Sequence, residues 1–417
     1  MKKLKYIMFA LLAVAILSTA AITSAQGNSP QDKLPQASSG GVVSWVHIGD
    51  LHITTADQQS YADFKTIIAN TNQYLKNGIN FVYLPGDNAN DGTESEYQLI
   101  KQATDQLQVP LYAIPGDHDH KGISLYNQYV EPRLYQSFSV GEYHFVLLDV
   151  MSGISSEEKT WLTNDLDAAA KAGLKNVVFM HTYNLASSLQ DLIQKDNVIV
   201  VDTGHTHTNE IANDGHTLYA ATRSTGQAIE GPVGFSIVNL DNGVVSWKFK
   251  PLGSFPFVMI TSPSDKQLII DPSQAVKGTV DIRAKIWDDK GVTATTMQID
   301  GGTAMTLQRI GDTPMWSASF DSTKVSDGDH KITVNVTGAG GNTSSDTITV
   351  VVNQAGSFQV PQRAFGASGN SIGAYAEKGL LGNQTAGGPS PQGSPSAPPN
   401  DPKGSPSAPP NAPKGGK

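Results

Sequence analysis

The sequence predicts a layered α/β domain followed by an all-β sandwich. Over about residues 42–252, short apolar runs of strand type alternate with segments whose apolar residues recur at helical spacing. From about residue 255 the pattern becomes an alternation of apolar and polar positions, as at Val280, Ile282 and Ala284. Several such runs, separated by glycine-containing turns, indicate an immunoglobulin-type sandwich over residues 255–353.

The two ends of the chain have compositions unlike that of a packed domain. Residues 1–25 combine a basic start, an apolar stretch and small residues near the end, as in an export signal. The apolar stretch, Tyr6 to Leu17, is shorter than the roughly 20 residues that a membrane span requires, which favours a cleaved signal over an anchor. Residues 26–41 are expected to be a linker. The Pro/Gly/Ser-rich residues 354–417 are expected to form a disordered tail, either solvated or lying along a cell wall.

Charge and cysteine content exclude some classes of function. Without residues 1–25, which hold three lysines and no acid, 26 Lys and Arg face 38 Asp and Glu, so the net charge is near −12. Nonspecific nucleic-acid binding depends on neutralising phosphates with Lys and Arg, so we do not expect it here. The chain has no cysteine, hence neither disulfides nor lipid attachment through cysteine. No segment after the signal is apolar enough for a membrane span, so a secreted, periplasmic or cell-surface protein is expected.

The expected elements of the α/β domain follow from the apolar runs and their boundaries. Strands are expected at 42–48, 81–84, 110–114, 143–150, 177–180, 198–201, 217–222, 234–240 and 244–249. Capping boxes at Thr93/Glu96 and Ser155/Glu158 predict the starts of two helices. The aromatic-rich segment 123–142 is expected to be irregular.

Polar residues follow five of these strands directly. The residues concerned are Asp50, His52, Asp87, Asp117, His181, His205 and His207. Singly, an aspartate after glycine is more often a turn or helix cap, and a lone histidine at a strand end is usually just hydrogen-bonded. In combination, carboxylates and imidazoles at the ends of successive strands are the ligand types that a pair of metal ions needs. The sequence therefore predicts one dinuclear metal site.

The same motifs, in the same order, resemble those of the calcineurin-like metallophosphoesterases: Asp-x-His, Gly-Asp, Gly-Asn-His-Asp/Glu, His and Gly-His-x-His. The resemblance covers roughly residues 43–250. The stretch 86–92 (GDNANDG) is most similar to the branch that contains cyclic-nucleotide and glycerophosphodiester phosphodiesterases. The resemblance implies two facing mixed β-sheets flanked by helices, the four-layer metallophosphoesterase fold.

The resemblance also implies a role for each motif residue. Asp50, His52 and His207 would bind one ion, Asp117, His181 and His205 the second, and Asp87 would bridge the two ions, which would be Mn, Fe or Zn. A hydroxide between the ions would attack phosphorus. His118 would protonate the departing oxygen, and Asp119 would orient the His118 ring.

Asp117 departs from the family pattern, which has asparagine at this position. With two divalent ions, three carboxylates and a hydroxide, the centre becomes neutral instead of carrying one positive charge. One hypothesis is that a trivalent iron restores the charge. The alternative is that the substitution is tolerated with some loss of rate.

These observations predict an exported enzyme that hydrolyses a small-molecule phosphodiester. Two alternatives stay open: a phosphomonoesterase with the same site, and a catalytically weak surface binding or adhesion protein. Residues 327–344 (DGDHKITVNVTGAGGNTS) are similar to bacterial immunoglobulin-like repeats of extracellular proteins, which implies a spacer or adhesion role and cell-surface association for the sandwich.

Overall fold

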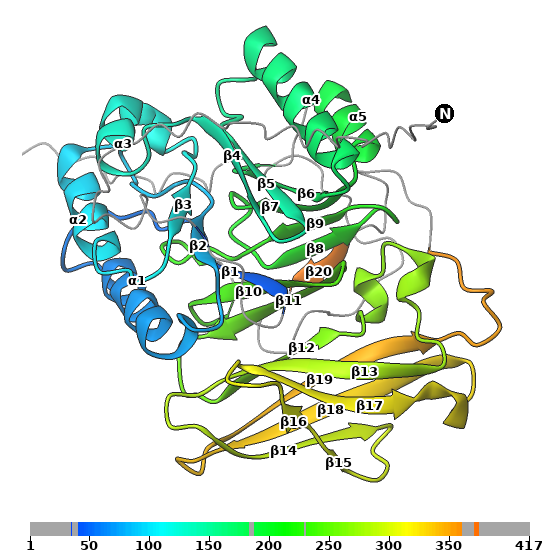
Figure 1. Cartoon of the computed structure of the whole chain (residues 1–417). Coiled ribbons are helices and arrows are strands. Elements are labelled where there is room, and N and C mark those ends of the chain that lie inside the picture. Colours follow the sequence, from blue (N-terminus) through cyan, green and yellow to red (C-terminus); the bar gives the residue numbers. More distant parts are fainter. Residues whose placement is uncertain (1–34, 36–40, 183–186, 229–230, 361–370, 375–417) are drawn as a thin grey trace, which may run out of the picture.

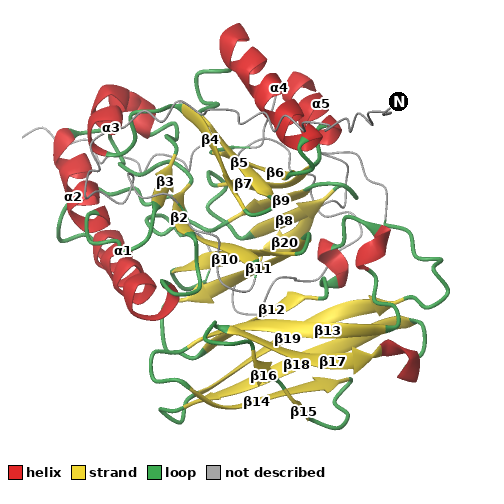
Figure 2. Cartoon of the chain, viewed as in Figure 1, coloured by secondary structure: helices red, strands yellow, loops and turns green. Residues whose placement is uncertain are grey.

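The structure is a computed structural model, and it describes residues 35, 41–182, 187–228, 231–360 and 371–374. Two β-sheets face each other, and helices cover the outer face of each (Figures 1 and 2). A separate all-β domain packs against one side of this α/β domain. The predicted fold class, four α/β layers followed by an all-β sandwich, is confirmed.

The first sheet has the strand order β11-β10-β1-β2-β3. Its strands are β1 (Val42–His47), β2 (Phe81–Leu84), β3 (Leu111–Ala113), β10 (Gly234–Asp241) and β11 (Val244–Pro251). Strands β1, β2 and β3 are parallel, whereas β10 and β11 are antiparallel to their neighbours. The carboxyl ends of β1, β2 and β3 therefore share one rim.

The second sheet has the order β20-β8-β9-β7-β6-β5-β4. Its strands are β4 (Tyr135–Val140), β5 (Tyr143–Leu148), β6 (Lys175–Met180), β7 (Val198–Thr203), β8 (Glu210–Asn213), β9 (Leu218–Ala221) and β20 (Ser371–Ala374). Strands β5, β6, β7 and β9 are parallel, so their carboxyl ends also meet at one rim.

Helices bury one apolar face each against the sheets. The helices are α1 (Gln59–Asn70), α2 (Glu94–Thr104), α3 (Ile123–Tyr129), α4 (Ser156–Lys171) and α5 (Ser187–Lys195). Helices α1 and α2 share a core with the first sheet, and α4 and α5 share one with the second. Both predicted capping boxes are present, at the starts of α2 and α4, where they satisfy backbone N–H groups that lack helical partners.

Aromatic rings fill the space between the two sheets. Trp45 on the first sheet makes edge-to-face contacts with Phe145 and Phe179 on the second, with ring centroids 5.9 and 5.5 Å apart. Asp202 of β7 is fully buried, and its carboxylate accepts hydrogen bonds from Trp45 Nε1 (2.8 Å) and His47 Nδ1 (2.7 Å). These contacts fix one sheet relative to the other, and with them the two rims.

The all-β domain is a sandwich of two four-stranded antiparallel sheets. One sheet contains β12 (Phe257–Ser262), β13 (Thr279–Trp287), β17 (Met315–Asp321) and β16 (Gln308–Arg309). The other contains β15 (Met305–Thr306), β14 (Val292–Ile299), β18 (Gly328–Gly338) and β19 (Thr343–Val352). Alternate residues of both sheets form its core, as the sequence pattern predicted.

Three parts of the chain differ from the sequence expectation. Segment 123–142, expected to be irregular, contains α3 and β4, and β8 was not expected at all. Strand β4 lies at the edge of its sheet, where only one neighbour is present, and its alternation is accordingly weak. Residues 371–374 form β20 on β8, although a disordered tail was expected from residue 354.

The expected signal at 1–25 and the rest of the tail lie outside the described residues, as does most of the expected linker. Among the described helices, none is both long enough and apolar enough to cross a bilayer.

Candidate metal centre

The nine residues that the sequence singled out lie just after parallel strands, eight of them in loops and Asp119 at the start of a short 3-10 helix, Asp119–Gly122. Asp50 and His52 follow β1, Asp87 follows β2, Asp117, His118 and Asp119 follow β3, His181 follows β6, and His205 and His207 follow β7. Because these strands end at facing rims of the two sheets, their loops converge. The seven expected metal ligands form overlapping groups there.

The backbone of these loops has several positive φ angles. Among the described residues, seven non-glycine residues have a positive φ, and four of them are His52 (43°), Asp87 (51°), His205 (68°) and His207 (58°). Left-handed backbone is costly for such residues and persists where the surroundings impose it, often at functional sites. The other three are Asn and Asp residues outside the site. Asn, Asp and His all adopt this conformation more readily than other non-glycine residues, and four of the seven examples gather at the candidate site.

The first group of ligands joins loops of both sheets. His52 Nε2 lies 3.1 Å from His207 Nε2 and 3.6 Å from Asp87 Oδ2. Asp50, Asp87 and His207 offer ligand atoms that all lie within 4.8 Å of one another. Asp50 and His52 are buried.

The second group contains Asp87, Asp117, His181 and His205, whose ligand atoms also lie within 4.8 Å of one another. His181 Nε2 is 3.5 Å from Asp87 Oδ2 and 3.4 Å from Asp117 Oδ1. His205 Nδ1 is 3.1 Å from His181 Nε2 and 3.3 Å from Asp117 Oδ1.

The spacing of these atoms fits metal binding. Nitrogen and oxygen atoms about 2.1 Å from one ion are separated by about 3.0 Å at right angles and about 3.4 Å at tetrahedral angles. In the His52–His207 pair and in the His181–His205 pair, a ring nitrogen of one histidine lies 3.1 Å from a ring nitrogen of the other. One shared proton can satisfy a single pair of nitrogens, but a cation can accept lone pairs from all the clustered nitrogen and oxygen atoms at once.

The protonation states also suit metal ligands. Burial lowers the pKa of His52 to about 3, so its ring is neutral and has a lone pair to donate. Hydrogen bonds from His181 and His205 hold the pKa of Asp117 well below its usual range, so it is a carboxylate. His52 and Asp117 can therefore bind ions without first losing a proton. His181 differs: although burial opposes it, the Asp87 and Asp117 carboxylates raise the pKa of His181, so this ring must lose a proton to an incoming ion.

Surrounding groups set the direction of each ligand. His181 Nδ1 lies 2.8 Å from the Pro85 carbonyl oxygen, which can only accept, so Nδ1 carries a proton and Nε2 is the atom directed at the other ligands. Both carboxylate oxygens of Asp50 accept from His205 N, at 3.1 and 3.2 Å. A Cβ at Gly204 would lie 2.7 Å from Asp50 Oδ1, so only glycine allows this approach. Backbone carbonyls such as that of Pro85 carry no signal in the sequence.

His118 and Asp119 do not form the pair that the sequence predicted. The His118 ring Nδ1 lies 2.5 Å from the Asn90 carbonyl oxygen, which therefore orients the ring. Asp119 is fully buried, and its carboxylate accepts from Gly116 N, Asn88 N, Ala89 N and the Tyr97 hydroxyl at 2.9–3.1 Å. The orienting role expected for Asp119 is wrong, because its carboxylate is already used to tie the loop after β2 to the loop after β3.

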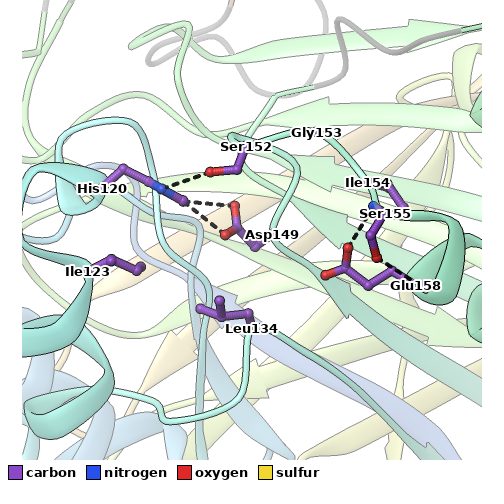
Figure 3. Close-up of a pocket in the computed structure, with 9 residues that line it drawn as sticks. All are labelled: His120, Ile123, Leu134, Asp149, Ser152, Gly153, Ile154, Ser155 and Glu158. Carbon is purple, nitrogen blue, oxygen red and sulfur yellow. Dashed lines mark hydrogen bonds and ion pairs between the residues drawn. The ribbon is translucent and has the colours of Figure 1, made fainter.

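A pocket of about 490 Å³ adjoins the loop that carries His118 (Figure 3). His120 Nε2 lies 2.9 Å from Asp149 Oδ2, and His120 Nδ1 lies 3.2 Å from Ser152 Oγ. Asp149 directly follows β5, whose Leu148 pairs with Met180, the residue before His181. The pocket thus opens at the same rim as the candidate metal centre.

Comparison with known protein families agrees with the geometry. Residues 44–209 match the family model described as calcineurin-like phosphoesterase, and residues 256–334 match the bacterial Ig domain. The family resemblance stated from the sequence is confirmed for both parts of the chain.

Two curated relatives are similar to the N-terminal part. Glycerophosphodiester phosphodiesterase GpdQ of Enterobacter lignolyticus is 29% identical over 154 residues, which cover 32% of this chain and 55% of the relative. The chain therefore spans about half the length of that relative. Probable glycerophosphodiester phosphodiesterase GpdQ of Arcobacter nitrofigilis is 24% identical over 194 residues, or 39% of this chain and 71% of the relative.

Solved structures with similar chains include a purple acid phosphatase, PPD1, from yellow lupin (Lupinus luteus) seeds, with a TM-score of 0.42 and 15% identity. That match covers 52% of each chain. A dimetal phosphatase from Danio rerio has a TM-score of 0.41 and 13% identity, covering 50% of this chain and 96% of the other.

Proposed function

Because residues 44–209 belong to the calcineurin-like phosphoesterase family, we propose that this protein is an exported phosphodiesterase with two metal ions. Asp50, His52 and His207 would hold one ion, and Asp117, His181 and His205 the other. The catalytic domain would comprise residues 42–252, and the sandwich residues 255–353.

One observation carries the proposal of two ions. Three ligand groups can be drawn at the rim, and Asp87 is the one residue that belongs to all three. A carboxylate has two oxygens and four lone-pair sites, so it can serve two ions at once. Bound ions would supply a nucleophilic hydroxide at neutral pH and neutralise charge on the phosphoryl oxygens.

His118 would supply the proton for the leaving group. Its Nδ1 proton is directed to the Asn90 carbonyl, so Nε2 is the atom free to exchange a proton with substrate. His118 also offers a nitrogen within 4.8 Å of ligand atoms of His52 and Asp87, which places it at the edge of the metal centre. A histidine held in this way can protonate a departing alkoxide without moving its ring.

The pocket beside this loop would receive the alcohol part of the substrate. Its walls combine the aliphatic residues Ile123, Leu134 and Ile154 with the Ser152 hydroxyl and the His120 ring, and none of the nine lining residues is Phe, Tyr or Trp. Such a lining suits a small aliphatic alcohol with free hydroxyls better than a nucleobase, which is usually held by stacking. The two relatives named as glycerophosphodiester phosphodiesterases support the same choice.

A comparison of leaving groups tests this function. With Mn²⁺ added, the wild-type protein should hydrolyse a glycerophosphodiester and bis-nitrophenyl phosphate faster than nitrophenyl phosphate, a monoester. His118→Ala should lower kcat for the glycerophosphodiester by about 10²–10⁴-fold, but much less for the nitrophenyl diester, because nitrophenolate leaves without a proton. A faster rate on the monoester would make the protein a phosphomonoesterase. If no phosphoester in a broad panel is hydrolysed, the surface-binding function replaces the enzymatic one.

Export and surface association complete the proposal. The match of residues 256–334 to the bacterial Ig domain is consistent with a location outside the cytoplasm, and the N-terminal sequence has the features of an export signal. Detection of the mature protein in the medium or on the cell surface, starting near residue 26, would test the location.

A further inference from the structure

A second pocket lies where the two domains meet, away from the candidate metal centre, and has a volume of about 560 Å³. One wall is formed by a π-helical turn, Thr71–Leu75, and the loop that follows it. The other wall is formed by the end of β13 and the start of β17 in the sandwich. Ligand pockets occur preferentially at domain interfaces, and π-helical turns occur frequently at functional sites.

Three aromatic side chains line this interdomain pocket: Tyr74, Trp287 and Trp316. The ring of Tyr74 is stacked on Phe255 with centroids 3.8 Å apart and an interplanar angle of 9°, so its orientation is fixed. Tyr74 and Trp316 are partly exposed. They give the pocket rigid apolar surfaces in an otherwise polar seam.

One residue that lines the interdomain pocket, Trp287, carries a buried donor without an acceptor among the described residues. Trp287 is 2% exposed, and its indole Nε1 has no hydrogen-bond acceptor among the described residues. Gly78, which also lines the pocket, lies directly against this atom, and a Cβ at residue 78 would clash with it. A buried N–H group without an acceptor is rare in native proteins.

The polar residues of the pocket include both donors and acceptors. Donors are the amides of Gln73 and Asn77 and the guanidinium of Arg309, and acceptors are the carboxylates of Asp288, Asp289 and Asp312. Gln73 Nε2 donates to Asp289 Oδ2 at 2.8 Å across the domain boundary, which links the two walls.

This composition selects among ligand classes. Three carboxylates against one guanidinium give a negative pocket, which disfavours phosphate esters and acidic sugars. The three carboxylates would attract an amine, but an amine only donates hydrogen bonds and would leave the donors Asn77 and Arg309 without acceptors. Hydroxyl groups both donate and accept, and the C–H face of a pyranose ring packs on an aromatic surface.

We propose that the interdomain pocket binds a neutral saccharide, with Tyr74 and Trp316 contacting the sugar rings and Asn77, Arg309 and Asp312 bonding to their hydroxyls. The proposal does not depend on the chemistry of the metal centre. It gives the sandwich a role: it supplies half of a binding site that holds the catalytic domain on a glycan.

Intrinsic tryptophan fluorescence and calorimetry with the full-length protein test this site. The probes are neutral gluco-, manno-, galacto-, xylo- and N-acetylglucosamine oligosaccharides, with spermidine and oligogalacturonate as charged comparisons. At least one neutral oligosaccharide should bind, and the double variant Asn77→Ala/Asp312→Ala should weaken its binding by about tenfold or more. Both residues are exposed, so this variant should keep the fold and the phosphoesterase activity.

Matched variants separate a local effect from a general one. Asp281→Ala removes an exposed aspartate elsewhere on the same sandwich and should leave binding unchanged. Trp316→Phe should keep more affinity than Trp316→Ala, because phenylalanine retains a stacking surface. The proposal is overturned if no neutral saccharide binds, if binding is equal in wild type and the double variant, or if only spermidine or oligogalacturonate binds.

Discussion

The rim of the catalytic domain and the seam between the two domains both bury ionisable side chains, but they arrange them differently. At the seam, positively charged side chains form ion pairs with carboxylates. Arg283 Nε lies 2.8 Å from Asp241 Oδ2, and Lys248 Nζ lies 2.7 Å from Asp346 Oδ1. At the rim, imidazole nitrogens face each other, as in the His52–His207 pair at 3.1 Å. These charges at the seam are paired within the protein, whereas the rim gathers side chains of the kind that bind cations.

The difference shows how to separate structural from functional burial of charge. A buried charge that meets its counter-charge holds elements together, and removal of one partner destabilises the fold. A cluster of potential ligands that lie close to one another, without counter-charges for each, is instead a candidate ion site. Variants at the rim should therefore lose activity and the stabilisation by added metal ions, whereas variants at the seam should lower the free energy of unfolding and keep the response to metal ions.

Asp87→Ala should have the largest effect of the rim variants. Loss of the residue shared by all three ligand groups should lower hydrolysis by at least about 10³-fold, since several kcal/mol of transition-state stabilisation depend on the ions. Added Mn²⁺ should raise the Tm of the wild type but not of this variant, because a ligand stabilises only the state that binds it. Differential scanning fluorimetry with and without Mn²⁺ measures this. An equal Mn²⁺ response in both proteins would contradict the assignment.

Asp241→Ala should have the opposite signature. Asp241 is fully buried and accepts from Arg283 and, at 2.7 Å, from Thr261 Oγ1, so its removal should lower the free energy of unfolding by about 3 kcal/mol. The Mn²⁺-induced rise in Tm should persist. Urea denaturation compares it with Asp281→Ala, an exposed control that should match the wild type.

Lys285 provides a pH-dependent test of the seam. Burial lowers its pKa from 10.5 to about 7, and its Nζ lies 2.8 Å from Ser44 Oγ. Between these two pH values the unfolded chain binds the extra proton, so the free energy of unfolding should rise as pH rises from about 7 towards 10. Lys285→Met should flatten this rise and stabilise the protein at pH 7 by about 1–3 kcal/mol.

Urea denaturation of metal-free protein between pH 6.5 and 9.5 measures the slope for wild type, Lys285→Met and Lys290→Met. Lys290 is exposed, so its variant should keep the wild-type slope. The same slope in Lys285→Met would show that Lys285 stays charged in the folded protein.

Asp117→Asn tests the unusual ligand at the rim. A carboxylate binds a cation more strongly than an amide, so the variant should hold the ion of the second group about tenfold more weakly. If the extra charge selects trivalent iron, protein purified without added metal should contain iron in the wild type and less in the variant. Full activity of the wild type with divalent ions alone would discard the iron hypothesis.

His120→Ala should have the smallest effect. His120 lines the pocket beside the metal centre but is not among the groups that can hold an ion. The variant should raise KM for a glycerophosphodiester by about fivefold and leave kcat nearly unchanged, because binding is weakened equally in the ground and transition states. A large fall in kcat instead would place His120 in the chemical step.

The sequence was most informative where local pattern and position coincide. Apolar runs that end in Asp or His predicted the convergence of Asp50, Asp87 and His181, because parallel strands bring their carboxyl ends together. The capping boxes of α2 and α4 were also predictable, because the two residues of each box, such as Ser155 and Glu158, lie within one helical turn of each other.

Contacts between segments far apart in the sequence could not be predicted from local patterns. The carbonyls of Pro85 and Asn90 orient His181 and His118, but every residue has a carbonyl. Asp119 follows His118 in the chain, yet its carboxylate is directed to the loop after β2. The edge strand β4 and the interdomain contact of Lys285 depend on partners far away in the sequence.

Anomalous diffraction from crystals grown with Mn²⁺ tests the central claim most directly. Two peaks per chain are expected, one bonded to Asp50, His52 and His207, the other to Asp117, His181 and His205, and both within bonding distance of Asp87. A single peak, or none at this rim, would contradict a dinuclear centre.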